Sequence, residues 1–132
     1  MFLINKRGFS KERQNIYING KLWKERKGLN LQISKKKDKL YVSINGEIDH
    51  HNSATVRESV DIEIKSGGVR QLIFDFSKLE FMDSSGIGII MGRYRLMSGI
   101  GGGVTVTGAS AYIEKILRLS GLEQIIKIQK SA

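Results

Sequence analysis

The sequence predicts an α/β protein in which helices cover a mixed β-sheet, with the element order β-β-α-β-α-β-α-β. Three observations support this prediction. Residues 31–34 and 40–46 alternate apolar and polar side chains around a charged turn, which is typical of a hairpin. Residues 51–68 and 84–97 repeat apolar side chains at helical spacing. Short runs rich in β-branched and aromatic residues separate these helices, as buried strands do.

The turn of the expected hairpin is strongly basic. Lys35, Lys36, Lys37 and Lys39 surround Asp38, a residue type that favours chain reversal. Such a cluster is either a solvated turn or a phosphate-binding site, and we favour the solvated turn.

The first helix is expected over residues 51–68. Asn52 or Ser53 can cap its N-terminus, and Gly67 with Gly68 ends it. Three apolar residues recur on one face at helical spacing: Val56, Val60 and Ile64.

Residues 69–77, VRQLIFDFS, predict a central strand that is buried on both faces. The second helix follows DFSKLEFM, and Asp83, Ser84 and Ser85 are all suitable N-cap residues. The two serines are therefore expected at a helix N-terminus. The expected apolar face of this helix consists of Ile87, Ile90, Met91, Tyr94 and Met97.

The C-terminal part predicts a strand over residues 101–108, a third helix over 111–120 and a last strand over 124–128. Ser110 is the expected cap of the third helix, and Gly121 ends it in a Schellman-like pattern. The later units are expected to be right-handed βαβ crossovers.

Composition fits one small domain. The chain has 132 residues, of which 40% are hydrophobic. It contains no apolar run long enough for a membrane span and no N-terminal signal-peptide pattern, so we expect a soluble cytoplasmic protein without membrane partners. Cysteine is absent, which excludes disulfides and thiolate metal sites.

The formal net charge of +9 is concentrated at the N-terminus. Residues 1–30 hold eight Lys and Arg against two acidic residues, which leaves a net charge of only +3 for residues 31–132. The hypothesis of a basic nucleic-acid-binding protein is therefore supported by residues 1–30 alone, and we expect no direct DNA binding.

Three stretches of the sequence resemble enzyme sites, but each has a simpler explanation. Gly86, Gly88 and Gly92 resemble a loosened dinucleotide fingerprint, but no acid follows about twenty residues later to hold a ribose. Glycines spaced by four on a helix more often let it lie close to a sheet. The run 101–103 precedes a strand, so it offers no helix N-terminus to a phosphate.

The sequence Asp49-His50-His51 resembles the DHH signature of certain phosphoesterases. Those enzymes need further aspartates in supporting motifs, which this chain lacks, and adjacent histidines point apart in a strand. We favour a polar strand end that leads into a helix, and we expect no metal ligands.

Ser84 or Ser85 could be a hydrolase nucleophile, because N–H groups at a helix start can bind an oxyanion. However, the only histidines are His50 and His51, and the G-x-S-x-G frame is missing. The sequence thus predicts no catalytic residues and no cofactor.

Two longer motifs resemble a known family. They are GEIDHHNSATVRE at residues 46–58 and LIFDFSKLEFMDSSGIGIIMGRYRLM at residues 72–97, with SGLEQIIKI downstream. Together they are similar to the STAS family of anti-sigma-factor antagonists, most closely its stage II sporulation branch. The resemblance covers about residues 29–132 and implies a STAS-type fold.

The resemblance implies a partner switch without catalysis by this chain. The unphosphorylated protein would bind an anti-sigma factor that is also a serine kinase with its own nucleotide, and so release a sigma factor. Phosphorylation of Ser84 would prevent binding until a PP2C-type phosphatase removes the phosphate. An alternative role for the same fold is a regulatory or scaffold module of another signalling assembly.

The resemblance also implies a partner-binding surface. It would combine the end of the second expected strand with the start of the helix that carries Ser84. The expected members besides Ser84 are Asp49, His50, Asp83, Ser85, Gly86 and Gly88.

Residues 1–28 form a basic leader that departs from the family pattern. The stretch NIYINGKLW could make a hairpin about Asn19 and Gly20, but an isolated hairpin is marginal in water, so we expect disorder. Lys24-Glu25-Arg26 can be encoded by a purine-rich, ribosome-binding-like string and Leu29 by TTG. Residues 1–28 are therefore hypothesised to be translated 5′ leader, with the domain spanning residues 29–132.

Overall fold

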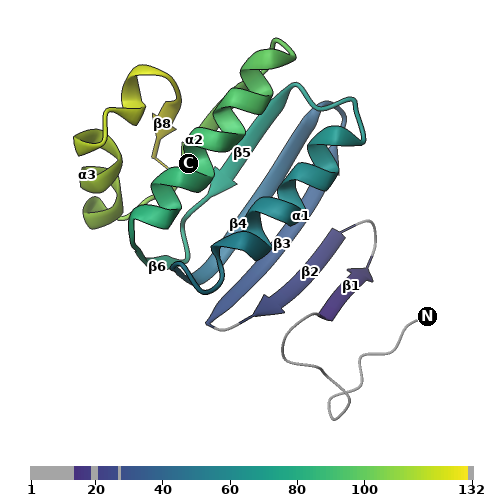
Figure 1. The fold of residues 1–132 in the computed structure, drawn as a ribbon, viewed down its shortest axis with the longest axis horizontal. Coiled ribbons are helices and arrows are strands. Elements are labelled where there is room, and N and C mark those ends of the chain that lie inside the picture. The colour runs from purple at the N-terminus through teal and green to yellow at the C-terminus, as the bar shows by residue number, and fades with distance from the viewer. Residues whose placement is uncertain (1–13, 19–20, 27, 131–132) are drawn as a thin grey trace.

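The computed structural model describes residues 14–18, 21–26 and 28–130. Its eight strands form one sheet in the order β1-β2-β3-β4-β5-β7-β8, and β6 pairs with β4. Figure 1 shows α1 and α2 lying across one face of this sheet. The elements are β1 Gln14–Ile18, β2 Lys21–Arg26, β3 Leu29–Lys36, β4 Lys39–Ile48, α1 Ser53–Lys65, β5 Gln71–Asp75, β6 Leu79–Met82, α2 Ser84–Gly99, β7 Gly103–Thr107, α3 Ala111–Leu119, the 3-10 helix η1 Leu122–Gln124 and β8 Lys127–Gln129.

The sheet is mixed, as the sequence predicts. Strands β1 to β4 pair antiparallel, whereas β4, β5, β7 and β8 run parallel. One helix connects each parallel pair, because parallel neighbours need a crossover connection. The expected hairpin turn falls at Lys37 and Asp38 between β3 and β4, and Lys37 adopts a left-handed conformation with φ of 58°.

The structure differs from the disorder expected in the leader. Strand β2 pairs antiparallel with β3, and β1 pairs with β2, so the hairpin extends the sheet and is not isolated. Leu22 is buried in the core, and Lys24 Nζ lies 3.2 Å from Ser59 Oγ of α1. Burial of an apolar side chain and pairing with a third strand supply the stabilisation that an isolated hairpin lacks. The expected turn at Asn19 and Gly20 and the first thirteen residues lie outside the described residues.

Strand β6 was not expected as a separate element. It is four residues long and pairs with the end of β4, after a register shift between Gly46 and Glu47. Gly46 has φ of 109°, and a Cβ there would lie 2.2 Å from the Gly28 carbonyl oxygen. A glycine is therefore required where β4 changes its partner from β5 to β6.

The core lies between the helices and the sheet. Alternate residues of the strands, such as Leu40, Val42 and Ile44 of β4, face it and are fully buried. The inward face of α2 is rotated from the expected one. Ile90 and Met97 are buried as predicted, but Ile87, Met91 and Tyr94 are only partly buried, while Gly86, Ile89 and Arg93 are buried instead.

Arg93 explains this rotation. Its Nε lies 2.8 Å from Asp61 Oδ1 of α1, although neither atom forms a well-aligned hydrogen bond there. Burial lowers the pKa of the Arg93 guanidinium, and the Asp61 carboxylate opposes this effect. An ion pair between α1 and α2 thus occupies a position that a purely apolar face would have filled.

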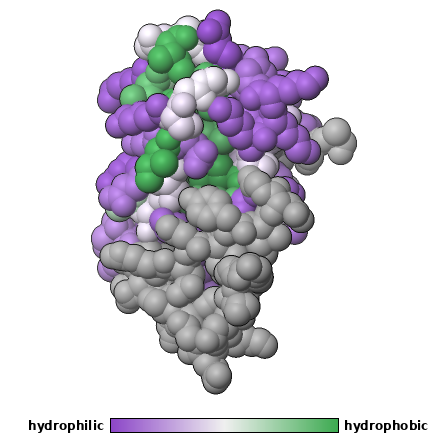
Figure 2. All heavy atoms as spheres, turned by 90° about the vertical axis from the view of Figure 1, so that its right-hand side faces the viewer, coloured by the Kyte–Doolittle hydropathy of each residue, from purple (hydrophilic) through white to green (hydrophobic). Residues whose placement is uncertain are grey.

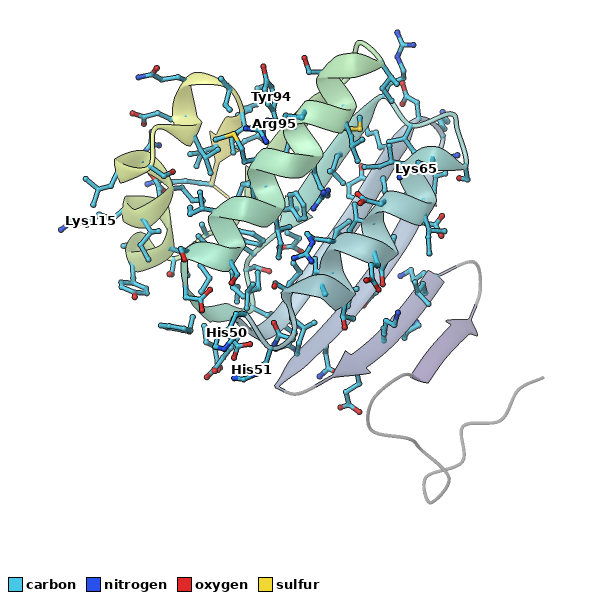
Figure 3. The ribbon with its side chains drawn as sticks, in the orientation of Figure 1. His50, His51, Lys65, Tyr94, Arg95 and Lys115 are labelled. Atoms are coloured by element: carbon cyan, nitrogen blue, oxygen red, sulfur yellow. The ribbon has the colours of Figure 1, made fainter. Side chains whose placement is uncertain are left out.

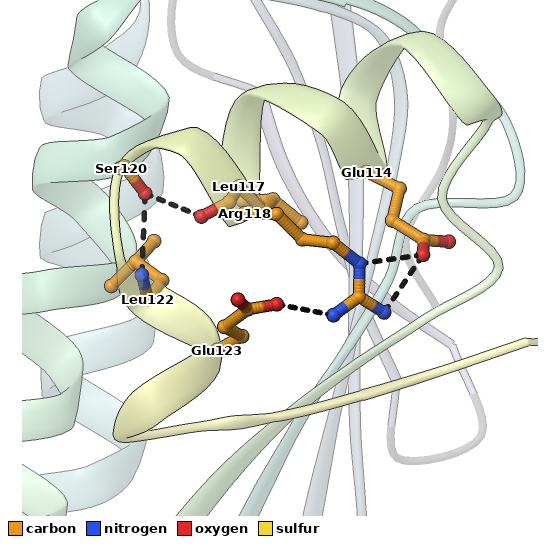
Figure 4. A network of polar contacts seen from close by, with 6 residues as sticks. All are labelled: Glu114, Leu117, Arg118, Ser120, Leu122 and Glu123. Carbon is orange, nitrogen blue, oxygen red and sulfur yellow. Dashed lines mark hydrogen bonds and ion pairs between the residues drawn. The ribbon is translucent and has the colours of Figure 1, made fainter.

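The third helix has, at both ends, the capping residues that the sequence predicts. Ser110 Oγ accepts a hydrogen bond from the Ile113 N–H at 3.2 Å, and Gly121 is left-handed with φ of 83°. Figure 4 shows that Arg118 joins Glu114 of α3 to Glu123 of η1. The hydrogen bonds that Arg118 donates to the Glu123 and Glu114 carboxylates raise the pKa of the Arg118 guanidinium. The last strand is Lys127–Gln129, later than the expected 124–128, because η1 occupies residues 122–124.

A groove separates the C-terminal ends of α1 and α2. It has a volume of about 390 Å³ and is lined by Ile64, Leu96 and Ile100 together with Lys65 and Arg70. Figure 2 shows a narrow strip of hydrophobic side chains among hydrophilic ones on the side of the molecule seen there. Ser84 is the first residue of the sixteen-residue helix α2, so it lies about 20 Å from this groove, at the other end of the helix.

Candidate functional site

The expected site residues follow two neighbouring parallel strands. Ile48 of β4 pairs with Met82 of β6, so the carboxyl ends of both strands lie at one edge of the sheet. The Asp83 N–H donates to the Ile48 carbonyl oxygen at 3.1 Å. The segment that contains Asp49 and His50 therefore lies beside the start of α2, as the family resemblance implies. Figure 3 shows His50 and His51 at this edge.

Asp83 is the residue that caps α2. Its backbone is extended, and its Oδ1 accepts a hydrogen bond from the Ser85 N–H at 2.8 Å. Ser84 and Ser85 are the first two helical residues, Ser84 exposed and Ser85 half-buried. Of the three expected cap residues, Asp83 is therefore the one that caps the helix. Ser84 presents its side chain to solvent, and Ser85 is half-buried.

The pKa of the Asp83 carboxyl group depends on Ser85 in the first turn of α2 and on His50 in the loop after β4. Burial raises its pKa, but hydrogen bonds from the N–H and hydroxyl of Ser85 outweigh this effect, with smaller contributions from the charge and N–H of His50. The net result is a pKa below the ordinary value. Asp83 is therefore ionised at neutral pH and ties the β4 loop to the helix start.

The loop between β4 and α1 is fixed by Asp49 and Asn52. Asp49 Oδ1 accepts from the N–H groups of His51 at 2.8 Å and Asn52 at 3.2 Å. The buried Asn52 side chain accepts from the Asp49 N–H and donates to the Glu47 carbonyl oxygen, both at 3.0 Å. Asn52 is the N-cap residue of α1, but its side chain makes no capping hydrogen bond, contrary to the expected role. The Asp-x-x-Asn spacing, which favours such turns, is the sequence signal that identifies this pair.

The two histidines lie in a turn, and their arrangement corrects the expectation that they point apart. Their ring centroids are 4.0 Å apart, with planes inclined by 38°. Both residues are exposed. No group of three His, Asp or Glu residues that could hold a metal ion occurs among the described residues.

The glycines of α2 differ in how closely they are packed. A Cβ on Gly86 would lie 2.6 Å from Met82 Sδ, whereas a Cβ on Gly88 or Gly92 would meet nothing within 4 Å. Close packing of the helix start against β6 therefore depends on Gly86. The expectation that Gly88 and Gly92 serve the same purpose is wrong, because both face open space.

The first turn of α2 thus presents one exposed hydroxyl, on Ser84, beside an ionised carboxylate and an exposed imidazole. The geometry suits modification and recognition from solvent. Among the described residues, no helix is long and apolar enough to cross a membrane.

Comparison with known proteins identifies the family. The STAS domain model matches residues 30–132. The chain belongs to the STAS domain family. Over 102 residues it is 37% identical to the anti-sigma F factor antagonist of Paenibacillus polymyxa, covering 76% of this chain and 87% of that protein. It is 27% identical over 101 residues to the anti-sigma-B factor antagonist of Bacillus subtilis (strain 168), covering 76% and 90%.

Solved structures agree with this assignment. The anti-sigma factor antagonist SpoIIAA in its unphosphorylated form superposes with a TM-score of 0.71 and 28% identity, covering 77% of this chain and 88% of that one. The Bacillus cell fate determinant SpoIIAA in the phosphorylated form gives a TM-score of 0.65 at 28% identity, covering 77% and 91%. The predicted STAS fold is confirmed.

Proposed function

We propose that this protein is an anti-sigma factor antagonist controlled by phosphorylation of Ser84. The exposed Ser84 hydroxyl at the start of α2 is the observation that carries this proposal. The similarity to antagonists of anti-sigma F and anti-sigma-B factors supports the class of partner. SpoIIAA has been solved in unphosphorylated and phosphorylated forms, which supports control by phosphorylation.

The environment of the two serines supports Ser84 over Ser85 as the acceptor. The Ser85 hydroxyl and N–H both bind the Asp83 carboxylate, and this side chain is half-buried. A kinase would have to break the Asp83 contact to reach Ser85. Ser84 is exposed and can be phosphorylated without disturbing the cap.

A phosphate on Ser84 would act on the complex and leave the fold intact. It adds about −1.5 to −2 charges at neutral pH. The positive end of the helix dipole tolerates this charge in the isolated protein. In a complex the phosphate would lie beside the ionised Asp83 and lose its water, at a cost of several kcal/mol. Each 1.4 kcal/mol weakens binding about tenfold, so phosphorylation abolishes association.

The proposed partner surface combines the start of α2 with the loop between β4 and α1. Ser84, Asp83, Ser85 and the exposed Gly88 would contribute from α2, with Gly86 setting the position of the helix start; Asp49 and His50 would contribute from the β4 loop. The partner would be an anti-sigma factor with serine kinase activity and its own nucleotide, and a PP2C-type phosphatase would reverse the modification.

In this scheme the protein is a substrate and binding module, not an enzyme, and acts in the cytoplasm where sigma factors work. The higher identity to the anti-sigma F factor antagonist, 37% against 27% for the anti-sigma-B factor antagonist of Bacillus subtilis, favours the sporulation branch.

The test uses three variants mixed with the cognate anti-sigma factor and ATP, with phosphate incorporation and complex formation measured together. Ser84→Ala should take up no phosphate and should keep binding, which locks the switch toward sigma factor release. Ser84→Asp should bind poorly while its melting temperature stays close to that of the wild type. Ser85→Ala should still be phosphorylated.

The outcomes distinguish the alternatives. Incorporation that persists in Ser84→Ala and vanishes in Ser85→Ala would move the acceptor to Ser85. If no anti-sigma factor binds the unphosphorylated protein, a regulatory or scaffold role in another signalling assembly becomes the better interpretation.

A further inference from the structure

The face of the sheet opposite α1 and α2 forms a broad polar surface, here called the open face. The strand registers place six of its side chains in one row across six strands. Neighbouring strands are about 4.8 Å apart, so this row spans about 24 Å. The row consists of Lys21, Ser34, Tyr41, Ile73, Thr105 and Lys127.

The open face is hollowed at its centre. A depression of about 390 Å³ is lined only by side chains of β4, β5, β7 and β8, among them Tyr41, Ile73 and Thr105. The central side chains are partly exposed, whereas their neighbours along each strand are buried under the helices. The depression is therefore open to solvent on the side away from α1 and α2.

Two aromatic residues lie on this face. Trp23 of β2 is 42% exposed, and it pairs across the ladder with Gln32 in the row next to that of Tyr41. Two strand spacings and one row separate Trp23 from Tyr41, which places them about 12 Å apart. Exposed aromatic rings at such spacing on a sheet can stack on successive or alternate bases of an extended single strand.

The charged side chains of the open face carry a small excess of positive charge. Among the described residues the register places four lysines there, Lys21, Lys36, Lys39 and Lys127, against the three acids Glu25, Glu47 and Asp75. Asp75 also accepts a hydrogen bond from the Ser77 N–H. A second copy of this chain packed face to face would bring the lysines together, which opposes a dimer through this surface.

We propose that the open face binds single-stranded nucleic acid. Lys21 and Lys127 at the two ends of the row, with Lys39 beside the depression, would contact the phosphates. Trp23 and Tyr41 would stack on bases, and Thr105 with Gln71 would hydrogen-bond to base edges. An acidic peptide could satisfy the lysines but would leave the two rings without planar partners.

The leader contributes directly to this surface. Lys21 and Trp23 belong to β2, which precedes the segment that matches the STAS family at residues 30–132. The expectation that the protein does not bind DNA treated the basic leader as separate from the domain, whereas β2 is part of the same sheet. The open face lies across the sheet from α2, so this proposal is independent of the switch at Ser84.

The experiment titrates the full chain with a labelled single-stranded RNA or DNA of about twelve nucleotides. Trp23 is the only tryptophan in the chain, so quenching of its emission reports stacking directly, alongside fluorescence anisotropy of the oligonucleotide. We expect saturable binding at about 50 mM salt that weakens as salt rises. Tyr41→Ala should weaken binding about tenfold, and Lys127→Glu should also lower the salt dependence by about one phosphate contact.

Lys115→Glu is the matched control, because Lys115 is exposed on α3 and the charge change is the same. It should leave binding within about twofold of the wild type. Circular dichroism and melting curves establish that each variant is folded, and Tyr41→Leu replaces Tyr41→Ala if the alanine variant is not. Equal weakening by Lys115→Glu, equal affinity for a duplex of the same length, or equal Trp23 quenching by polyglutamate would overturn the proposal. Unchanged Trp23 emission at saturation would overturn it as well.

Discussion

The inward and outward sides of α2 perform different tasks. The inward side is closely packed: Gly86 lies against Met82, and Arg93 pairs with Asp61 of α1. The outward side carries Ser84 and Gly88, which are exposed. Under the proposed switch, this difference would let the helix accept a change of charge at its start without unfolding, because the close packing lies on the inward side.

Removal of the buried ion pair between Asp61 and Arg93 should destabilise the inward side of α2 more than any other change proposed here. Asp61→Ala would leave the Arg93 guanidinium, whose side chain is 9% exposed, without its carboxylate. We expect a loss of about 2–3 kcal/mol in the free energy of unfolding, measured by urea denaturation, because an unpaired buried charge is costly. The double variant Asp61→Leu with Arg93→Met should recover most of this loss. A loss below about 0.5 kcal/mol in Asp61→Ala would show that water already solvates Arg93.

Gly86 and Gly88 give a matched pair on the two sides of the helix. Gly86→Ala should cost about 1–3 kcal/mol, because the new methyl group would push Met82 from its place. Gly88→Ala should keep or raise stability by up to about 1 kcal/mol, because alanine favours the helix and meets open space. Urea denaturation measures both. Reduced anti-sigma factor binding by a stable Gly88→Ala variant would then report contact with the partner, while destabilisation by Gly88→Ala would contradict the packing described here.

Much of the fold follows from local patterns in the sequence. The alternation in β3 and β4, the helical spacing in α1, and the Ser110 and Gly121 signals at α3 are all local, and the structure confirms them. The juxtaposition of Asp49 and His50 with the start of α2 followed from the family resemblance. Parallel pairing of β4 with β6 accounts for it physically.

The features that were missed depend on contacts distant in sequence. β6 has only four residues and is defined by its pairing with β4. The hairpin of β1 and β2 is stabilised by β3 and by Leu22 in the core, which no local pattern reveals. The orientation of α2 depends on Asp61, more than thirty residues before Arg93. The sequence gives no indication that Arg93 has a partner on another helix, so the apolar spacing alone predicts a buried face of α2 that is one position away from the observed one.

Asp83 links the two sides, and its charge gives a pH-dependent test. Its pKa is lower in the folded protein, so ionisation contributes stability above the unfolded-state pKa of about 3.9, and this contribution is lost as pH falls through the lower folded-state value. Asp83→Asn can still cap the helix but carries no charge. Its free energy of unfolding should therefore fall less than that of the wild type between pH 6 and pH 3, measured by urea denaturation at each pH. Parallel pH profiles of the two proteins would contradict the role of the Asp83 charge.

The smallest expected effect distinguishes the two serine hydroxyls in the absence of any partner. Ser85→Ala removes the hydroxyl that binds the Asp83 carboxylate, which should cost up to about 1 kcal/mol and is partly offset by the higher helix propensity of alanine. The melting temperature should fall by about 2–5 °C. Ser84→Ala is the control, because it removes an exposed hydroxyl and should leave the melting temperature unchanged or slightly raised. A lower melting temperature in Ser84→Ala but not in Ser85→Ala would exchange the two roles, making Ser84 the residue bound to the cap and Ser85 the one open to solvent.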